Sequence, residues 1–455
     1  MANKSKVFVR QLNEFAGECL PADVITRSKR SLLDYLSVAY AGAEFFRSKM
    51  WNYGLFSEPG GFFTVGKTSR HPLKSSVFMN GLYAHALDLD DGTNAGIIHL
   101  GSPIFSLLLP IAEKNNASME KLLRSAVTGY QASYTLACSL QPEHKLLGYH
   151  ATGTCGTVGA ALALSYMLDI SEEERFQIFG AACAASSGML QVLDDGSELK
   201  PYNVAKASLL ALTAVEMGTA GFKVHPDPLG GERGFMKMMT GEKDTAVQDV
   251  FRDNRYAITE AYIKPYASCR YTHPSIDAAL KVRREVEADE IETIQIKTYS
   301  LAVKGHDHVD IPDAAAGKMS IPYGVAVALV YGKVGLQEFS EKTLADKRIK
   351  DLCRRITVSP DSCLSQAFPS KQPAKIAVRL KNGREKTYAV DIPYGEPEMP
   401  MSEETFRNRY GELMEYGGVS SQTSEYVYNG IMDGTADLNE LCGALLKGCK
   451  RWQND

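Results

Sequence analysis

The stretch YAHALDLDDGTNAGIIHLGSP, residues 83–103, places two histidines and three aspartates close together, directly after a helical pattern. Apolar residues recur at helical spacing over residues 73–87, so His85 and Asp88 are expected one turn apart on the last turn of a helix. Asp90 and Asp91 then end this helix, where the helix dipole disfavours negative charge. An acidic cluster in that position suggests a functional site, and the equal alternative is a solvated loop behind a helix-terminal histidine.

Length and composition indicate a globular protein of two or so domains. The chain has 455 residues, of which 44% are hydrophobic and 23% are charged, and this length exceeds what one ordinary core holds. The net charge of -4 and the lack of a Lys/Arg-rich block argue against a nucleic-acid partner. The best candidate for a membrane span, residues 319–331, is too short and contains Pro322, so no membrane partner is expected.

The N-terminus and the cysteines favour a cytoplasmic protein. The first six residues lead into mixed polar sequence and lack the apolar core of a signal peptide. The nine cysteines are odd in number, scattered and never spaced as CxxC. This pattern indicates reduced thiols, with neither a disulfide framework nor a zinc knuckle.

Hydrophobic periodicity divides the chain into a helical domain and a smaller mixed domain. Nearly every segment up to about Gly221 has a helical pattern, with one strand-like piece at residues 62–65, whereas residues 291–299 alternate as a strand. Residues 376–380 and 387–390 flank Asn382-Gly383, which is a favoured hairpin turn. The predicted fold class is mainly α: a large all-helical domain (residues 1–263), an inserted α+β lid domain (264–397), and C-terminal helices (398–455) that return to the helical domain.

Two further stretches carry side chains that suit an anion. His150 precedes a glycine- and threonine-rich helix start, whose exposed amides can hold a carboxylate. The alternative is that these glycines only allow tight helix packing. Lys200 and Lys206 lie around a second helix start and can neutralise a carboxylate or donate a proton, the alternative being an ordinary solvated pair.

The presumed domain boundary gathers another reactive group of side chains. Lys264, Cys269, Arg270 and His273 lie within ten residues there, and ligands often bind between domains. Arginine in particular suits bidentate capture of a carboxylate. Further on, Tyr323 opens an apolar helix, where it can serve as an acid or simply pack its ring.

Residue spacing argues against a metal or nucleotide site. Asp90 and Asp91 lack the third acidic residue of a DDxxD magnesium motif, and His85 has no HExxH partner. The loop with His306 and His308 offers too few ligands for a metal. No GxGxxG follows a strand, so a nicotinamide cofactor is not supported. The remaining side chains suit metal-free acid–base chemistry on a small polyanion.

Several motifs, taken together and in order, resemble the MmgE/PrpD family, which includes 2-methylcitrate dehydratase, cis-aconitate decarboxylase and iminodisuccinate epimerase. The resemblance extends from about residue 10 to 440 and rests on residues 80–91, 99–103, 149–150, 200–207, 231–235, 264–273 and 320–323. The family implies a large helical domain with a smaller α+β lid, a homodimer and no cofactor. By position, the resemblance assigns an active-site set of Asp88, His99, His150, Lys200, Lys264 and Tyr323.

The resemblance implies a lyase that dehydrates or decarboxylates a small di- or tricarboxylate, through a carbanion or enolate next to a carboxylate. We hypothesise that His150 and His99 are the acid–base pair and that Asp88 orients a histidine. Tyr323 would donate a proton or a hydrogen bond. Substrate carboxylates and the enolate would be held by Lys200, Lys264 and Arg270. The other predicted substrate contacts are Cys269, His273, Gly92 and Lys206.

Two positions depart from the pattern of cis-aconitate decarboxylase. Gly92 stands where that enzyme has threonine, and Cys269 stands where it has histidine, which favours a product other than itaconate. An isomerase or epimerase of a dicarboxylate such as iminodisuccinate, with two bases on opposite faces of the substrate, is the alternative function. A third function, from another class, is a non-catalytic binding dimer.

Overall fold

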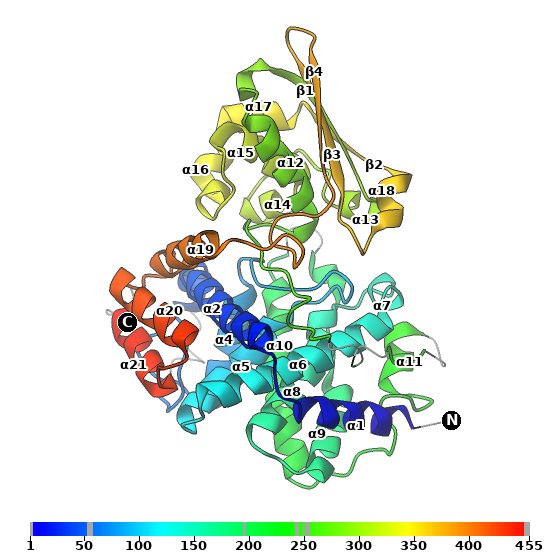
Figure 1. Cartoon of the computed structure of the whole chain (residues 1–455), viewed down its shortest axis with the longest axis vertical. Coiled ribbons are helices and arrows are strands. Elements are labelled where there is room, and N and C mark those ends of the chain that lie inside the picture. The colour runs from blue at the N-terminus through cyan, green and yellow to red at the C-terminus, as the bar shows by residue number, and fades with distance from the viewer. Residues whose placement is uncertain are drawn as a thin grey trace. The chain divides into compact units, whose positions relative to one another are not determined.

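The computed structural model describes residues 3–51, 58–193, 197–241, 245–248, 251 and 255–449. The chain folds into two compact units. Unit 1 comprises residues 1–261 and 404–455, and unit 2 comprises residues 262–403. The expected boundaries lay after residues 263 and 397. Each unit is described separately below, and Figure 1 shows its helices and strands in chain order by colour.

Unit 1 is all-helical in the part that the structure describes, and its last three helices come from the C-terminal segment. In Figure 1 these orange and red helices lie beside α2, with which α20 is in contact. The helices of unit 1 are α1 (Lys4–Ala16), α2 (Ala22–Phe45), α3 (Arg47–Trp51), α4 (Leu73–His85), α5 (Gly101–Lys114), α6 (Met119–Leu140), α7 (Glu143–Leu146), α8 (Ala151–Met167), α9 (Glu172–Ala185), the 3₁₀ turn η2 (Leu190–Leu193), α10 (Lys200–Thr219), α11 (Phe235–Thr240), α19 (Glu403–Tyr416), α20 (Ser421–Asp433) and α21 (Leu438–Gly448).

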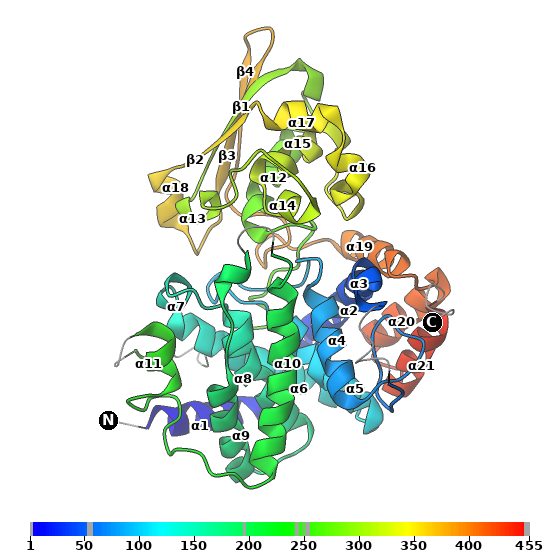
Figure 2. The ribbon, with the colours of Figure 1, turned by 180° about the vertical axis from the view of Figure 1, so that it is seen from behind.

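The core of unit 1 is centred on α8. Every residue from position 151 to 165 is buried, as expected of a helix that is apolar on all sides. The helix is in contact with α5, α6, α9 and α10. Figure 2, which views the molecule from behind, shows α9 and α10 beside α8. Glycine makes the closest approach possible, because a Cβ built on Gly159 would lie 2.6 Å from the carbonyl oxygen of Gly129 on α6.

Unit 2 is an α+β unit with one four-stranded sheet. Strand order is β2-β1-β3-β4, with β1 parallel to β2 and the other neighbours antiparallel. The β3–β4 turn contains Gly383 at φ +83°, where a side chain would be strained. The elements of unit 2 are η3 (Arg270–Thr272), α12 (His273–Arg283), η4 (Ala288–Glu290), β1 (Ile291–Thr298), α13 (Ser300–Val303), α14 (Ala314–Lys318), α15 (Ile321–Tyr331), η5 (Gln337–Phe339), α16 (Glu341–Leu344), α17 (Lys347–Cys353), β2 (Ile356–Pro360), α18 (Ser362–Ala367), β3 (Ala374–Leu380) and β4 (Glu385–Val390).

One face of this sheet is covered by helices. Along β1, Ile294 and Ile296 are buried while Gln295 and Lys297 are exposed, so the strand alternates as the sequence predicted. Helix α12 contacts β3 and β4, and α15 contacts β2, and Figure 1 shows both helices on the same side of the sheet. The fold is therefore mainly α, with a smaller α+β unit, as expected.

Two local predictions differ from the structure. Helix α4 ends at His85, so Asp88 does not lie on its last turn. Asp88 instead has a left-handed backbone, with φ +53°, which aspartate tolerates better than most residues. Residues 62–65, which resembled a strand, form only an isolated bridge from Phe62 to His71.

Within the described ranges, no helix has both the length and the apolar character needed to cross a membrane. All nine cysteines are free thiols.

Candidate active site

Four helix ends in unit 1 meet around the loop that follows α4. His85 is the last residue of α4, and Gly101 begins α5. His150 is the N-cap of α8, and Lys200 is the first residue of α10. The backbone N–H of His99 donates to Thr152 Oγ1 at 3.1 Å, which ties the loop to α8. The helix ends thus bring together residues that are more than 100 positions apart in the sequence.

An ion pair between Lys200 and Asp88 lies at the centre of this cluster. Lys200 Nζ donates to Asp88 Oδ1 at 2.6 Å, and both side chains are mostly buried, with 17% and 11% exposure. His99 Nε2 lies 3.9 Å from the same carboxylate oxygen. Asp88 therefore faces one ammonium group and one imidazole, and it stabilises a positive charge on either.

The hydrogen bond of His99 indicates its tautomer. Its Nδ1 lies 2.8 Å from the backbone carbonyl oxygen of Asp91. Because a carbonyl only accepts, Nδ1 carries the proton in this bond. In the neutral ring Nε2 is then the acceptor, and it is the nitrogen nearer to Asp88. His99 can accept a proton on Nε2 and be stabilised there as a cation.

His85 is held by a buried carboxylate. Its Nδ1 lies 2.8 Å from Asp90 Oδ1, and the other oxygen of Asp90 accepts from Ser102 Oγ at 2.6 Å. The His85 ring contacts the His99 ring edge to face, with centroids 4.6 Å apart. The bonds among His85, Asp90 and Ser102 thus fix the position of the His85 ring beside His99.

Asp91 is a second buried acid next to Asp90. It accepts from the backbone N–H of Gly101 at 2.9 Å and from the hydroxyl of Tyr130 at 2.6 Å. Burial raises the pKa of Asp91 to about 6, although the Tyr130 and Gly101 donors pull in the opposite direction. The side chain of Asp91 thus links the start of α5 to α6, and its backbone carbonyl oxygen accepts the hydrogen bond from His99.

The ring nitrogen Nδ1 of His150 is buried without a hydrogen-bond partner among the described residues, as is Nε2 of His85. The side chain is 6% exposed, and its ring centroid lies 6.0 Å from that of His85. Burial lowers the pKa of His150 well below its usual value, and the nearby His85, Lys200 and His99 lower it further. His150 is therefore a neutral imidazole at neutral pH, and it is suited to accept a proton.

The cluster also contains side chains of the kinds that bind metal ions. His85, Asp88, Asp90 and His99 offer ligand atoms within 4.8 Å of one another. However, Lys200 already neutralises Asp88, and His85 and Asp90 are bonded to each other. A divalent cation would have to displace an ammonium group, so the donor set does not fit a metal well.

In unit 2 the predicted arginine and histidine are used within the fold. Arg270 forms a buried ion pair with Glu396 through two of its nitrogens, and its third nitrogen lies 2.8 Å from His273 Nδ1. The other nitrogen of His273 lies 3.2 Å from the carbonyl oxygen of Ser268. Their polar atoms are thus bound by neighbours, and we propose a structural role for both in place of the expected substrate contacts.

Tyr323 is also bound within unit 2. Its hydroxyl donates to the backbone carbonyl of Glu338 at 2.7 Å, and its side chain is 2% exposed. Burial raises the pKa of Tyr323, so the hydroxyl holds its proton. We propose that Tyr323 anchors α15 rather than acting as an acid.

The other two predicted contacts in unit 2 are less exposed than a surface site would be. Lys264 is 1% exposed, and Cys269 is half-buried, with its backbone N–H bound to the carbonyl of Lys318.

Lys206 and the glycine-rich helix start also have local explanations. Lys206 Nζ lies over the ring of Tyr202, 5.9 Å from its centroid, and burial lowers its pKa. The amide of Gly153 donates to the carbonyl of His150 at 2.9 Å, so it is not open to a substrate carboxylate. Gly92, by contrast, is buried within the loop of residues 86–100 between α4 and α5, called the acidic loop below, and lies four residues from Asp88.

Two members of the cluster were not predicted from the sequence. Ser102 lies in the opening stretch, where a hydroxyl at a helix start reads as a cap. Tyr130 lies in the middle of α6, at a position that periodicity assigns to the core. No local signal distinguishes either residue, because their importance depends on which carboxylate the fold brings to them.

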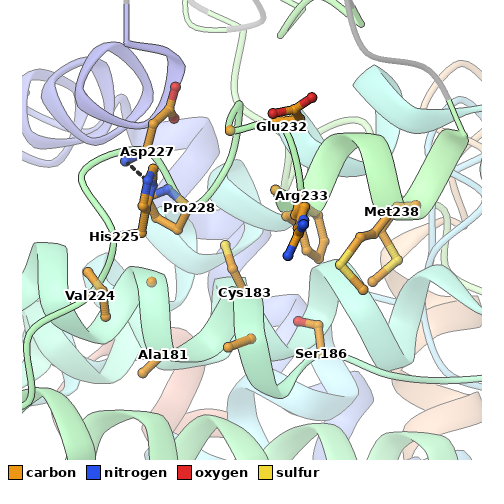
Figure 3. Close-up of a pocket in the computed structure, with 16 residues that line it drawn as sticks. Ala181, Cys183, Ser186, Val224, His225, Asp227, Pro228, Glu232, Arg233 and Met238 are labelled. Carbon is orange, nitrogen blue, oxygen red and sulfur yellow. Dashed lines mark hydrogen bonds between the residues drawn. The ribbon is translucent and has the colours of Figure 1, made fainter.

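A separate pocket in unit 1 contains none of the predicted site residues. It has a volume of about 840 Å³ and lies between α9 and residues 224–239. Figure 3 shows its lining, with Cys183 on the helix, Ser186 directly after its end, and His225 and Arg233 on the facing segment. The motif at residues 231–235, which contributed to the family resemblance, lines this pocket and not the histidine cluster.

Fold and site together define a class: a mainly helical protein of two units, with a buried acid–base cluster of histidine, aspartate and lysine at converging helix ends. The chain belongs to the MmgE/PrpD family. The MmgE/PrpD N-terminal domain matches residues 8–248, and the MmgE/PrpD C-terminal domain matches residues 266–427.

Curated relatives cover nearly the whole chain at low identity. A cis-aconitate decarboxylase-like protein of Aspergillus oryzae is 24% identical, over 94% of each chain. Cis-aconitate decarboxylase of Aspergillus terreus is 23% identical, over 94% of this chain and 92% of its own. The human cis-aconitate decarboxylase is 23% identical, over 88% of this chain and 86% of its own.

Proposed function

We propose that this protein is a lyase that acts on a small di- or tricarboxylate through a carbanion or enolate next to a carboxylate. The observation that carries the proposal is the buried, neutral His150, whose Nδ1 has no partner among the described residues, in the same cluster as the Lys200–Asp88 ion pair. A base and a cation together are what proton removal next to a carboxylate requires. The decarboxylase relatives support the same reaction class.

The first step moves one proton and one electron pair. Neutral His150 takes a proton from the carbon next to a substrate carboxylate, and the electron pair of that C–H bond moves into the carboxylate to form an enolate. Lys200 has two N–H groups besides the one on Asp88. In this proposal they bind the carboxylate and stabilise the charge that develops on it.

The second step depends on the leaving group. In a dehydration, the enolate electrons return and expel a hydroxyl group from the next carbon, and protonated His99 supplies the proton that makes it water. A decarboxylation needs no proton removal: the C–C bond to a carboxylate breaks, its electron pair stays on the carbon as carbon dioxide leaves, and the resulting carbanion takes a proton from protonated His99. Asp88 stabilises the cationic form of His99 in either case.

Substrate choice and assembly are further parts of the proposal. Gly92 lies in the acidic loop, and we propose that the space left by its missing side chain selects a substrate other than cis-aconitate. Lys264, Cys269 and Lys206 remain predicted substrate contacts. A homodimer without a cofactor is the assembly that we propose, and sedimentation analysis of the purified protein tests it.

An epimerase is the second candidate function. The observation in its favour is that the cluster holds more than one imidazole, so that one could remove a proton and another could return it. Solvent deuterium incorporated into a recovered substrate of unchanged composition would identify this reaction. A loss of water or carbon dioxide would identify the lyase.

The experiment is a panel of di- and tricarboxylates, analysed by mass spectrometry with and without EDTA. We expect the His150→Ala variant to lower turnover by about 10²–10⁴-fold, with no effect of EDTA on the wild type. The matched control is His71→Gln, because His71 is also buried, with its pKa lowered to about 4, but lies outside the cluster. Unchanged turnover in His150→Ala would remove His150 from the mechanism.

The panel also tests the non-catalytic alternative. A binding dimer would be stabilised by a carboxylate in a thermal-shift assay without converting it. A protein that neither converts nor binds any member of the panel would contradict the proposed substrate class.

A further inference from the structure

The acidic loop is held from behind by a side chain of the C-terminal segment. Arg409 on α19 donates through Nη2 to the backbone carbonyl of Leu89 at 3.2 Å. Through Nη1 it donates to Asp34 Oδ1 on α2 at 2.6 Å. One guanidinium group therefore joins three segments of unit 1, namely α2, the acidic loop and α19.

This contact is buried. Arg409 and Asp34 have side chains that are 9% and 2% exposed, and the Leu89 side chain is 3% exposed. A buried carbonyl that loses its donor has no water to replace it, and this costs free energy. Breaking the bond from Arg409 to the Leu89 carbonyl is therefore costly, so the peptide is held in the orientation that keeps this bond.

Arg409 holds the peptide between Leu89 and Asp90, and Leu89 is flanked by two acids of the cluster, Asp88 and Asp90. Leu89 follows Asp88, whose φ of +53° is an uncommon backbone conformation for a residue other than glycine. It precedes Asp90, which binds His85 and Ser102. A rotation of the Leu89 peptide would turn both carboxylates away from their partners.

Charge gives Arg409 a second effect on the same loop. Asp34, Asp90 and Asp91 are all at most 3% exposed, and Asp34 is repelled by Asp90. The guanidinium group of Arg409 offsets this negative charge at the back of the loop. The front of the loop is neutralised separately, by Lys200 on Asp88.

We propose that Arg409, paired with Asp34, is a positioning residue that fixes the Leu89 peptide and thereby aims Asp88 at Lys200 and His99. It does not touch the reacting atoms. Its kinetic test rests on the proposed function, whereas its effect on the loop can be measured without a substrate.

The first variant is Arg409→Lys, which keeps the charge but cannot form the same two-pronged contact. We expect kcat to fall by about 10- to 100-fold, since small misplacements of catalytic groups have effects of this size. KM should change by less than about threefold. The matched control is Arg70→Lys, because Arg70 forms an equivalent pair with the buried Glu113 in unit 1, away from the acidic loop. It should keep wild-type kcat.

A second variant separates positioning from stability. In Asp34→Leu/Arg409→Met both charges are removed, so neither partner of this pair is left as an unpaired buried charge, and the fold should be retained. The Leu89 carbonyl still lacks its donor, and we expect the same loss of kcat as in Arg409→Lys. Recovery of kcat in this double variant would show that Arg409 acts only through stability, and would overturn the proposal.

Hydrogen exchange provides the readout that needs no substrate. The backbone N–H of Asp88 donates to the backbone carbonyl oxygen of His85 at 3.2 Å. Hydrogen exchange at this N–H should become at least about tenfold faster in both Arg409 variants but not in Arg70→Lys. Equal exchange in all proteins, or full kcat despite faster exchange, would overturn the positioning role. A wild type without turnover on any carboxylate would instead count against the proposed function, and the exchange result would still stand.

Discussion

Two acid–base groups of the cluster are shifted in opposite directions by the same cause. Burial disfavours whichever form is charged, so it lowers the pKa of His150 and raises that of Asp91. His150 is thereby kept neutral and able to accept a proton. Asp91 is stabilised as an anion by its bonds to Tyr130 and Gly101 and by the nearby charge of Arg27, which makes it a structural acid.

The shift of His150 leads to a prediction for the pH dependence of activity. Because its pKa lies well below the usual value of 6.5, the base stays unprotonated as the pH falls through 6.5. We expect the acid limb of the kcat/KM profile to lie below pH 6.5 for the free enzyme. Steady-state rates between pH 4.5 and 8 would measure this. An acid limb centred at pH 6.5 or higher would show that His150 is not the base, or that it is solvated.

The helix ends around the acidic loop depend on close packing of the helices behind them. Gly81 brings α4 against Ala205 of α10, where a Cβ would lie 2.8 Å from the Cα of Ala205. Gly159 does the same between α8 and α6, where a Cβ would lie 1.8 Å from Ser133 Oγ. The small residues in these helices therefore set the positions of His85, His150 and Lys200.

A substitution at one of these contacts should separate packing from helix propensity. We expect Gly159→Ala to lower the free energy of unfolding by about 1–3 kcal/mol, because the added methyl group overlaps Ser133 and the carbonyl of Gly129. The control is Gly443→Ala in α21, where a Cβ meets nothing within 4 Å. It should gain about 0.4–1 kcal/mol. Urea unfolding would measure both, and equal effects would contradict the packing explanation.

At the scale of the molecule, each unit has its own core and its own buried polar network. Unit 1 is tied together by the Arg409–Asp34 pair, between segments 375 residues apart. Unit 2 has an equivalent pair, Arg270–Glu396, between segments 126 residues apart. Both pairs join the beginning of a unit to its end. The Arg409–Asp34 pair is one of the contacts that tie the C-terminal helices to unit 1 after the α+β unit.

Buried histidines in unit 1 should make the molecule sensitive to acid. Burial lowers the pKa of His71 and of His144 to about 4, and that of His150 also lies well below 6.5. Below pH 6.5 the unfolded chain binds these protons while the native state does not, so stability is complete above pH 6.5 and is lost as the pH falls. Asp91, with its pKa raised to about 6, opposes the trend by about one proton, because the native state holds that proton between pH 4 and 6.

The test uses one histidine outside the cluster. Each histidine should contribute about 1.4 kcal/mol per pH unit between its two pKa values. In His144→Gln, the slope of unfolding free energy against pH between 4.5 and 6 should therefore be lower by about this amount. Urea midpoints at several pH values would measure it. A slope equal to that of the wild type would mean that His144 is not buried in the neutral form.

Much of the fold could be predicted because its signals are local. Alternation in β1 and the Asn382-Gly383 turn of the hairpin are properties of neighbouring residues, and the structure has both elements where they were expected. The predicted end of α4 was wrong: Asp88 has a left-handed backbone, and its side chain pairs with Lys200, 112 residues away in the sequence. Periodicity continues past His85 although the helix does not.

The sequence by itself determined the division into helical and mixed segments, the family, and the residue types available for acid–base chemistry. Only the tertiary structure decided which residues of unit 1 share a cluster and which polar atoms of unit 2 are bound by neighbours. Arg270, His273 and Tyr323 have the right chemistry, yet their polar atoms are bound by Glu396, Ser268 and Glu338. Conversely, Tyr130 and Arg409 gain their roles from carboxylate and carbonyl groups 39 and 320 residues away. The physical reason is that hydrogen-bond partners and burial set what a polar group can do, and both depend on contacts distant in sequence.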